Sequence, residues 1–446
     1  MRFAAISMIA TAALLWSAPQ SASTARKTAP SKSRTAVKSK TAAKSTKTPK
    51  KRRRPPPVSP ELRKASLEQV HESIASPYAF ENPAGLVPFF ERLFRMKQEY
   101  PTVHVLHYGD SHTASDDLAS AIRDNFQQRF GDGGPGFFFP GRPFTGYRRY
   151  DVGSVNSRYW TTLGTMRNRG DTLHGLSGLS ITSRRKGETA TVIASGEEAE
   201  LFYLQQPGGG TIEVYVDSVF EGEIPTAGEL GPARAPISII PGERRFLFKT
   251  KTMAPVRLLG MVVQYKAGVT WETLGINGAT AAVQHDWDET ILATQLRHRD
   301  PSLIVIAYGT NEANSRRWEP ESYTTSLGRL IERFRRLSPT SSILLLGPPD
   351  CRLRTMANLD RVIDIQRSIA AATNCAFWDW RARMGGPGTI RTWVRAGMAQ
   401  NDHIHFTQSG YQLAGQTLYA DLIHQYEAFL KIRTETQNNA QAIQDP

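Results

Sequence analysis

Apolar residues follow two different rhythms along the chain, and the change between them divides it into parts. Before residue 135, the strand-like run at 103–108 leads through a glycine turn into a stripe with helical spacing: Leu118, Ile122, Phe126 and Phe130. Short apolar runs and helical stripes alternate again from residue 256 to about residue 432. Strands that alternate with helices predict a three-layer α/β domain with a parallel sheet, built from residues 61–135 and 256–432.

The segment between these two parts, residues 136–255, has a different pattern. Short runs with alternating apolar and polar residues are separated by turns rich in glycine and proline, as at 207–210 and 241–242. Such regularly punctuated strands predict an antiparallel β-sandwich, here of the jelly-roll type found in carbohydrate-binding domains. We expect this β-sandwich domain to be inserted between the first and second strands of the parallel sheet.

Both ends of the chain differ from the body. Arg2 precedes a predominantly apolar run at 3–16, and small residues follow at 23–25, which predicts a signal peptide over residues 1–25 and export to the periplasm or cell envelope. The run is shorter than the ~20 residues of a transmembrane helix, so we expect no span in the mature chain. An uncleaved anchor and an organelle transit peptide are the alternatives. The polar end, 433–446, is expected to be disordered.

The charge of the chain is concentrated in a basic tail. The 446 residues include 55 Lys and Arg against 41 Asp and Glu, a net charge of +14, but residues 1–60 hold 14 of the basic residues and no acidic one. The rest is balanced at 41 of each, which argues against a nucleic-acid-binding body. Residues 26–60 therefore predict a disordered spacer and a weak electrostatic tether to an anionic envelope surface.

The two cysteines predict neither a disulfide nor a metal site. Cys351 follows one expected strand and Cys375 opens the next, so the two would lie near opposite ends of a parallel sheet. No spacing typical of metal ligands occurs, and the chemistry described next requires no cofactor.

Three residues far apart in the sequence are of the types that make a serine nucleophile. Ser111 follows the strand at 103–108, and Asp402 lies three positions before His405. A serine hydroxyl needs an adjacent base, and the base needs an orienting carboxylate. His403 would face the same side as His405 on an extended segment, but the spacing from Asp402 selects His405.

An oxyanion formed at Ser111 would need preorganised donors. The candidates are the backbone N–H groups of Ser111 and Gly278 and the side-chain amide of Asn311. His112 adjoins the serine but points elsewhere, which makes it a poor base; it either contacts substrate or packs in the interior. His107, His285 and His298 are interpreted as structural.

In this chain order the segments resemble the four blocks of the SGNH (GDSL-like) hydrolase superfamily. The blocks are Gly109-Asp110-Ser111, Gly278, Gly309-x-Asn311 and Asp402-x-x-His405, the last followed by Phe-Thr-x-x-Gly-Tyr. His112 replaces the leucine of the commonest first block. The resemblance implies a flavodoxin-like fold, a Ser111–His405–Asp402 triad and an oxyanion hole at Ser111, Gly278 and Asn311. It also implies that Asp110 is a structural residue of the turn.

Export, the inserted β-sandwich, the basic tail, the Ser-His pair at 111–112 and the segment 130–137 together are similar to periplasmic peptidoglycan O-acetylesterases. That resemblance implies removal of 6-O-acetyl groups from N-acetylmuramic acid, with the acetylated glycan as substrate. The alternatives are a glycan O-acetyltransferase that uses the same triad and a catalytically inactive wall-binding protein.

Overall fold

The computed structural model describes residues 58–77, 80–96, 98–353 and 355–444, with side chains as far as residue 436. The expected signal peptide and nearly all of the basic tail lie outside these residues. Within them, no helix combines the length and the apolar character needed to cross a bilayer.

The apolar runs of the two flanking parts form a five-stranded parallel sheet in the order β13-β1-β14-β15-β16. The strands are β1 (Thr102–Gly109), β13 (Gly268–Gly275), β14 (Leu303–Ala307), β15 (Ser342–Leu346) and β16 (Ala376–Trp378). Numbered along the chain, this order is 2-1-3-4-5, the flavodoxin-like order that the resemblance implied. The order reverses between β1 and β14, and loops that leave a sheet at such a point diverge and open a crevice.

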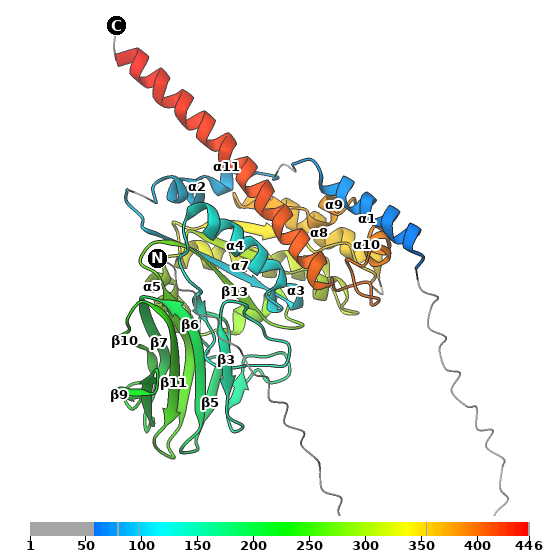
Figure 1. Ribbon diagram of the computed structural model, residues 1–446. Coiled ribbons are helices and arrows are strands. Elements are labelled where there is room, and N and C mark those ends of the chain that lie inside the picture. The colour runs from blue at the N-terminus through cyan, green and yellow to red at the C-terminus, as the bar shows by residue number, and fades with distance from the viewer. Residues whose placement is uncertain (1–57, 78–79, 97, 354, 445–446) are drawn as a thin grey trace, which may run out of the picture. The chain divides into compact units, whose positions relative to one another are not determined.

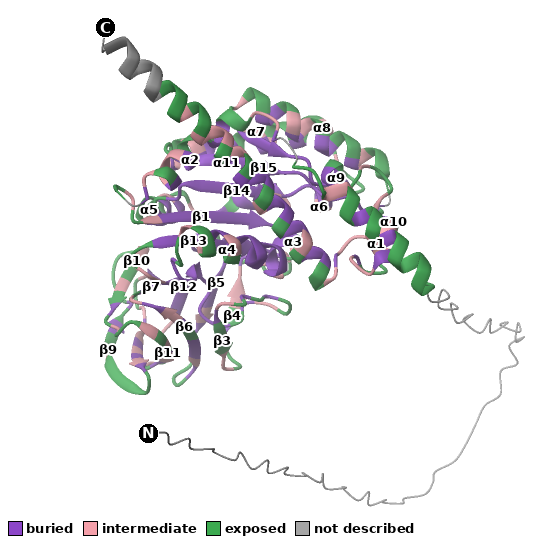
Figure 2. Ribbon diagram, turned by 45° about the horizontal axis from the view of Figure 1, so that its top comes forward, coloured by how far each residue is buried: buried purple, intermediate pink, exposed green. Residues whose placement is uncertain are grey.

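Helices cover both faces of the parallel sheet, as the alternation of elements predicted. On β1, Val103 and Val105 pack with α2, α4 and α11, whereas Leu106 and Tyr108 pack on the side of α5, α7 and α8. Figure 1 shows α4 and α11 crossing the same face, and Figure 2 shows the buried strands between helices with exposed outer surfaces. The helices are α1 (Pro60–Ile74), α2 (Val87–Phe94), α3 (Ser111–Ala114), α4 (Asp117–Phe130), α5 (Glu289–Arg299), α6 (Thr310–Ala313), α7 (Pro320–Leu337), α8 (Met356–Ala372), α9 (Trp380–Arg383), α10 (Ile390–Ala396) and α11 (Gln408–Gln444), with 3-10 turns at Pro83–Leu86 and Ala281–Asp286.

The inserted segment forms two antiparallel sheets that share one core. One sheet has the order β10-β7-β12-β5-β4, with β2 also paired to β12, and the other has the order β3-β6-β11-β8-β9. Phe246 of β11 and Leu201 of β7 belong to the same buried cluster, as expected for the inward faces of a sandwich. The strands are β2 (Gly136–Phe138), β3 (Gly153–Asn156), β4 (Thr161–Leu163), β5 (Ser180–Ser183), β6 (Thr189–Gly196), β7 (Glu198–Gln205), β8 (Thr211–Val216), β9 (Val219–Pro225), β10 (Gly231–Ile237), β11 (Gly242–Thr250) and β12 (Val256–Gln264).

Pairing within the insertion follows a folded ribbon. The hairpin β8/β9 lies at its tip, and the pairs β7/β10, β6/β11 and β5/β12 follow in turn. The boundary that we expected at residue 256 is therefore wrong, because β12 is a strand of the antiparallel sheet and the parallel sheet resumes only at β13. Nearly every residue of β12 is buried, so its continuous apolar run imitates a strand of a parallel sheet.

The C-terminal end also differs from expectation. Residues 433–444 continue α11 as a helix, where a disordered tail was predicted. The segment holds no glycine or proline, and its twelve residues include three glutamines and two alanines. It therefore contains no residue that ends a helix already formed on the core. Cys351 and Cys375 are both buried and unpaired with each other, which confirms the prediction of no disulfide.

Candidate active site

Four loops bring the sequence-predicted residues to one edge of the parallel sheet. Ser111 begins α3 directly after β1, Gly278 follows β13, and Asn311 lies in α6 directly after β14. The loop before α11 carries Asp402 and His405. Because the carboxyl ends of parallel strands meet at one edge, residues up to 294 positions apart become neighbours there.

Ser111, His405 and Asp402 form a continuous chain of hydrogen bonds. Ser111 Oγ lies 3.0 Å from His405 Nε2, and His405 Nδ1 lies 2.8 Å from Asp402 Oδ2. With a proton on Nδ1, the imidazole donates to the carboxylate and presents a lone pair on Nε2 to the serine hydroxyl. The arrangement can therefore remove the Ser111 proton as a carbonyl carbon is attacked.

The loop itself holds the Asp402 carboxylate in place. Its Oδ1 accepts hydrogen bonds from the backbone N–H groups of Ile404 and His405, at 2.9 and 3.0 Å. Partial burial works against ionisation, but the bonds from the His405 ring and these N–H groups hold the pKa of Asp402 below its ordinary value. His403 has a left-handed φ of 58°, so the segment is not extended, and His403 does not line the cavity described below.

The turn that presents Ser111 is tightly packed. A Cβ at Gly109 would collide with the Thr113 hydroxyl and lie 2.9 Å from the Ala307 carbonyl oxygen, so only glycine fits there. Asp110 is buried; its Oδ1 accepts from the His112 N–H at 2.9 Å and its Oδ2 accepts from Asn311 at 3.1 Å. Burial raises the pKa of Asp110 to about 7. Asp110 thus connects the turn to the next loop, the structural role that the resemblance implied.

Two backbone donors face the space beside Ser111. Among the described residues, the N–H groups of Ser111 and Gly278 donate to no other group, and both residues line the same cavity. Gly278 has a φ of +77°, which a residue without Cβ adopts at little cost. The side-chain nitrogen of Asn311 donates instead to Asp110 Oδ2 and to the Ala279 carbonyl, the latter at 3.0 Å. Asn311 would have to exchange one of these bonds to reach an oxyanion.

Glu312 is a site residue that the sequence analysis did not single out. Its carboxylate accepts from the N–H groups of Ala281 and Gly309 at 2.8 and 3.0 Å, so it ties the loop after β13 to the loop after β14. Burial, followed by the nearby Asp110 carboxyl, raises the pKa of Glu312 to about 7. The sequence did contain one signal for Glu312, because this residue follows Asn311 directly at the start of a helix after a buried strand.

His112 packs in the interior behind the triad. Its ring is buried between His405 and aromatic neighbours such as Trp380, and its Nδ1 lies 2.9 Å from the Tyr411 hydroxyl. Burial lowers the pKa of His112 to about 3, so the ring stays neutral at ordinary pH. Because the ring contacts His405 and does not line the cavity, His112 supports the triad histidine by packing.

A cavity of about 630 Å³ opens in front of Ser111 and His405. One wall is a loop of the inserted segment, residues 146–151, which contributes Gly146 and the exposed Arg148. The neighbouring Tyr150 hydroxyl donates to Asp117 Oδ1 at 2.5 Å and accepts from Gln408 at 3.2 Å. Tyr150 itself is 49% exposed at this rim.

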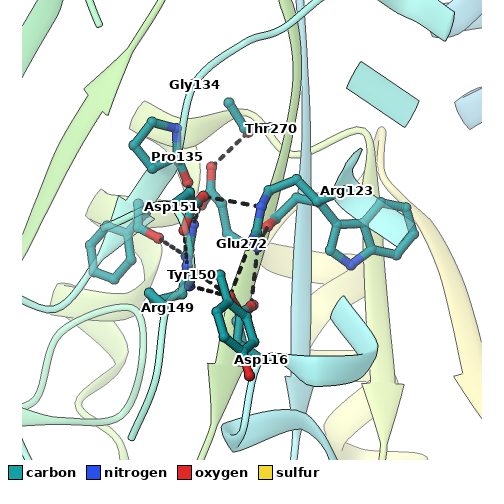
Figure 3. A network of polar contacts seen from close by, with 12 residues as sticks. Asp116, Arg123, Gly134, Pro135, Arg149, Tyr150, Asp151, Thr270 and Glu272 are labelled. Atoms are coloured by element: carbon teal, nitrogen blue, oxygen red, sulfur yellow. Dashed lines mark hydrogen bonds and ion pairs between the residues drawn. The ribbon is translucent and has the colours of Figure 1, made fainter. Parts of the chain in front are cut away.

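A buried network of ion pairs holds this loop against the parallel sheet (Figure 3). Arg149 makes two bonds to Asp151, at 2.7 and 2.9 Å, and donates to the Pro135 and Phe137 carbonyls. Arg123 of α4 makes two bonds to Asp116, at 2.9 and 3.1 Å, and its Nε lies 3.0 Å from Asp151. Although burial opposes it, the two arginines hold the pKa of Asp151 below its ordinary value. The network therefore fixes the wall of the cavity to the element that follows Ser111.

Comparisons with known proteins bear on the same elements. Residues 252–413 match the GDSL-like Lipase/Acylhydrolase family, and no curated protein gives a significant match. Among solved structures, "Peptidoglycan O-acetylesterase in action" is similar with a TM-score of 0.67 and 24% identity, over 79% of this chain and 99% of that one. A family two carbohydrate esterase from Clostridium thermocellum has a TM-score of 0.28 and 12% identity, over 55% of this chain and 94% of that one. A family two carbohydrate esterase from Cellvibrio japonicus has a TM-score of 0.27 and 11% identity, over 62% of this chain and 98% of that one.

The family match covers β12 to the start of α11, and the similarity to the first of these structures extends over 79% of the chain. Together with the Ser-His-Asp geometry at the crevice, these findings show that the chain contains a GDSL-like lipase/acylhydrolase domain, as in esterases of the SGNH (GDSL-like) hydrolase superfamily.

Proposed function

We propose that the protein is an exported serine esterase that removes O-acetyl groups from a cell-envelope polysaccharide, with peptidoglycan as the favoured polymer. The observation that carries the proposal is the bonded chain from Ser111 through His405 to Asp402, which opens onto a cavity lined by Gly278 and Asn311. The similarity in fold to a peptidoglycan O-acetylesterase supports the choice of polymer.

In the first step, Ser111 Oγ attacks the acetyl carbonyl carbon while His405 Nε2 accepts its proton. The oxyanion is stabilised by the Ser111 and Gly278 N–H groups, joined by the Asn311 amide once it leaves Ala279 or Asp110. The carbon–oxygen bond to the sugar then breaks, His405 returns the proton to the sugar oxygen, and acetyl-Ser111 remains. In the second step, water attacks the acetyl-serine, His405 accepts the water proton and passes it to Ser111 Oγ, and acetate leaves.

The inserted segment fits the proposal as a jelly-roll domain that holds the glycan. Its ribbon of pairs, β8/β9, β7/β10, β6/β11 and β5/β12, is the arrangement expected for two Greek keys rolled into a sandwich. In the same proposal, the signal peptide directs export and the basic tail contacts an anionic envelope surface.

Acetate release from purified O-acetylated peptidoglycan, with p-nitrophenyl acetate as a second substrate, tests the proposal. Ser111→Ala should abolish both reactions, whereas Ser368→Ala, at an exposed serine of α8, should leave both unchanged. Undiminished turnover by Ser111→Ala would refute the serine mechanism. Acetylation of added glycan at the expense of acetate release would instead indicate a transferase, and glycan binding without any turnover would indicate an inactive wall-binding protein.

A further inference from the structure

A second cavity adjoins the catalytic one on the side of the inserted segment. It has a volume of about 860 Å³ and is formed by residues 143–145 and 162–167 together with the loop after β13. Asn277 and Gly278 line both cavities, so the second cavity begins where the oxyanion is expected to form. A ligand that extends from the catalytic cavity past this loop enters the second one.

Contacts on both sides of the shared loop come from the inserted segment. The Asn277 side-chain nitrogen donates to the Thr145 carbonyl at 3.4 Å, and a Cβ at Gly146 would lie 3.3 Å from that nitrogen. On the other side, a Cβ added to Gly278 would lie 3.9 Å from Met166 Cγ, so Met166 packs beside this glycine. The insertion therefore touches the loop of the proposed oxyanion hole directly and does not form a separate binding surface.

The lining of the second cavity combines apolar surface with hydroxyl groups. Phe144 and Met166 are partly exposed there, beside Thr162 and Thr165. Thr165 Oγ1 accepts a bond from the Asn168 N–H at 3.1 Å, which leaves its own O–H free to donate. Apolar patches next to a few hydroxyl groups suit a pyranose ring, whose C–H face and hydroxyl edge need both kinds of contact.

One arginine lies at the wall of each cavity. Arg148 at the catalytic cavity interacts with the Tyr150 hydroxyl, and neither Arg148 nor Arg167 at the second cavity forms an ion pair with any described residue. Arg149, by contrast, is buried and paired with Asp151. An exposed guanidinium at a cavity wall favours an anionic group on the ligand, and carboxylates bind it through two parallel hydrogen bonds.

We infer that the second cavity is a subsite for the part of the glycan that extends from the acetylated group, and that Arg167 binds a carboxylate of an acidic glycan there. The inference rests on the proposed function and specifies its substrate class. Peptidoglycan fits this class because its acetylated muramic acid residues themselves carry carboxylates on lactyl or peptide substituents, whereas the sugar next to them in the polymer is uncharged. A neutral acetylated polysaccharide would fill the sugar subsite but give Arg167 no anionic partner.

The test compares kcat/KM on a polymer with kcat/KM on p-nitrophenyl acetate, which is too small to reach the second cavity. Arg167→Gln should lower the ratio for soluble O-acetylated peptidoglycan fragments by about tenfold or more, the effect of one charge-assisted hydrogen bond. Arg184→Gln is the matched control, since Arg184 is also exposed on the insertion but lines neither cavity, and its ratio should stay at the wild-type value. Thr145→Trp, which fills the second cavity, should lower the ratio further.

Neutral acetylated xylan separates the two parts of the inference. The ratio of kcat/KM on xylan to kcat/KM on p-nitrophenyl acetate should fall with Thr145→Trp but not with Arg167→Gln. An equal fall with Arg167→Gln on both polymers would overturn carboxylate recognition, and wild-type ratios for both variants on peptidoglycan would overturn the subsite. Failure of the proposed function is distinguishable, because wild-type protein would then show no Ser111-dependent release of acetate from either acetylated polymer.

Discussion

The side-chain nitrogen of Asn311 donates a hydrogen bond to Asp110 across 3.1 Å, although 201 positions separate the two residues. Asp110 precedes Ser111 in the turn after β1, and Asn311 follows β14, so the bond spans the point where the strand order of the sheet reverses. The turn that carries Ser111 and a predicted oxyanion donor are thereby held in one geometry. Both the chemistry and the stability of the site should depend on this pair.

Asn311→Ala should lower kcat for p-nitrophenyl acetate by about 10²–10³-fold, the usual effect of losing one oxyanion donor. It should also lower the free energy of unfolding by about 1–3 kcal/mol, because the buried Asp110 Oδ2 loses its hydrogen-bond donor. Steady-state kinetics and urea unfolding measure the two effects. A kcat within threefold of wild type would show that Asn311 keeps its bonds to Asp110 and Ala279 throughout the reaction.

Asp402→Asn should lower kcat by about 10²–10⁴-fold with little change in KM, since an amide cannot hold the His405 proton on Nδ1. The side chains of both residues are more than a third exposed, so water replaces part of the lost stabilisation and the variant should remain folded. Kinetics on p-nitrophenyl acetate provide the measurement, with circular dichroism to check folding. A folded variant that loses less than tenfold in kcat would argue that Asp402 does not orient the base.

The sequence predicted Ser111, Asp402 and His405 because Ser111 follows a recognisable strand and Asp402 lies three positions before His405. The network around Arg149 was not predictable in this way. Its members Asp116, Arg123 and Asp151 are charged residues of ordinary spacing, and only the fold reveals that they meet, with Asp116 and Arg123 buried and Asp151 partly buried. Patterns of polarity report which residues tend to be buried, and a buried ion pair violates that tendency.

The domain boundary failed for a related reason. A strand at the centre of a sandwich sheet and a strand of a covered parallel sheet are both buried on two faces, so β12 and β14 look alike in sequence. Which sheet a strand joins depends on its pairing with distant strands such as β7, which no local pattern contains. The end of α11 was missed because its last turns extend beyond the apolar stripe that marked the helix.

Arg149→Met should lower the free energy of unfolding by about 3–5 kcal/mol, because it leaves Asp151 and Asp116 with less positive charge in a buried site. The adjacent Arg148→Gln is the matched control: Arg148 is exposed, so its replacement should change the free energy by no more than about 0.5 kcal/mol. Urea unfolding of both variants gives the comparison. Equal stabilities for the two would mean that the network contributes no net stability.

Stability should also depend on pH through Asp110. Its pKa in the folded protein, about 7, lies above the ordinary value of 3.8 because the carboxyl is buried. Between these two pH values the folded chain holds a proton at Asp110 and the unfolded chain does not. The free energy of unfolding therefore falls as the pH rises from about 4 to about 7, and Asp110 has no further effect above that range.

Asp110→Asn removes this proton, so its free energy of unfolding should fall less steeply than that of wild type between pH 5 and pH 7. Asp402→Asn is the control: the pKa of Asp402 is lowered, so that carboxylate adds stability above pH 4 and loses it only at lower pH. Between pH 5 and pH 7, the free energy of unfolding of Asp402→Asn should therefore change with pH as steeply as that of wild type. Urea unfolding at pH 5, 6, 7 and 8 measures all three proteins, and an Asp110→Asn slope equal to wild type would show that Asp110 is already ionised in the folded protein at pH 5.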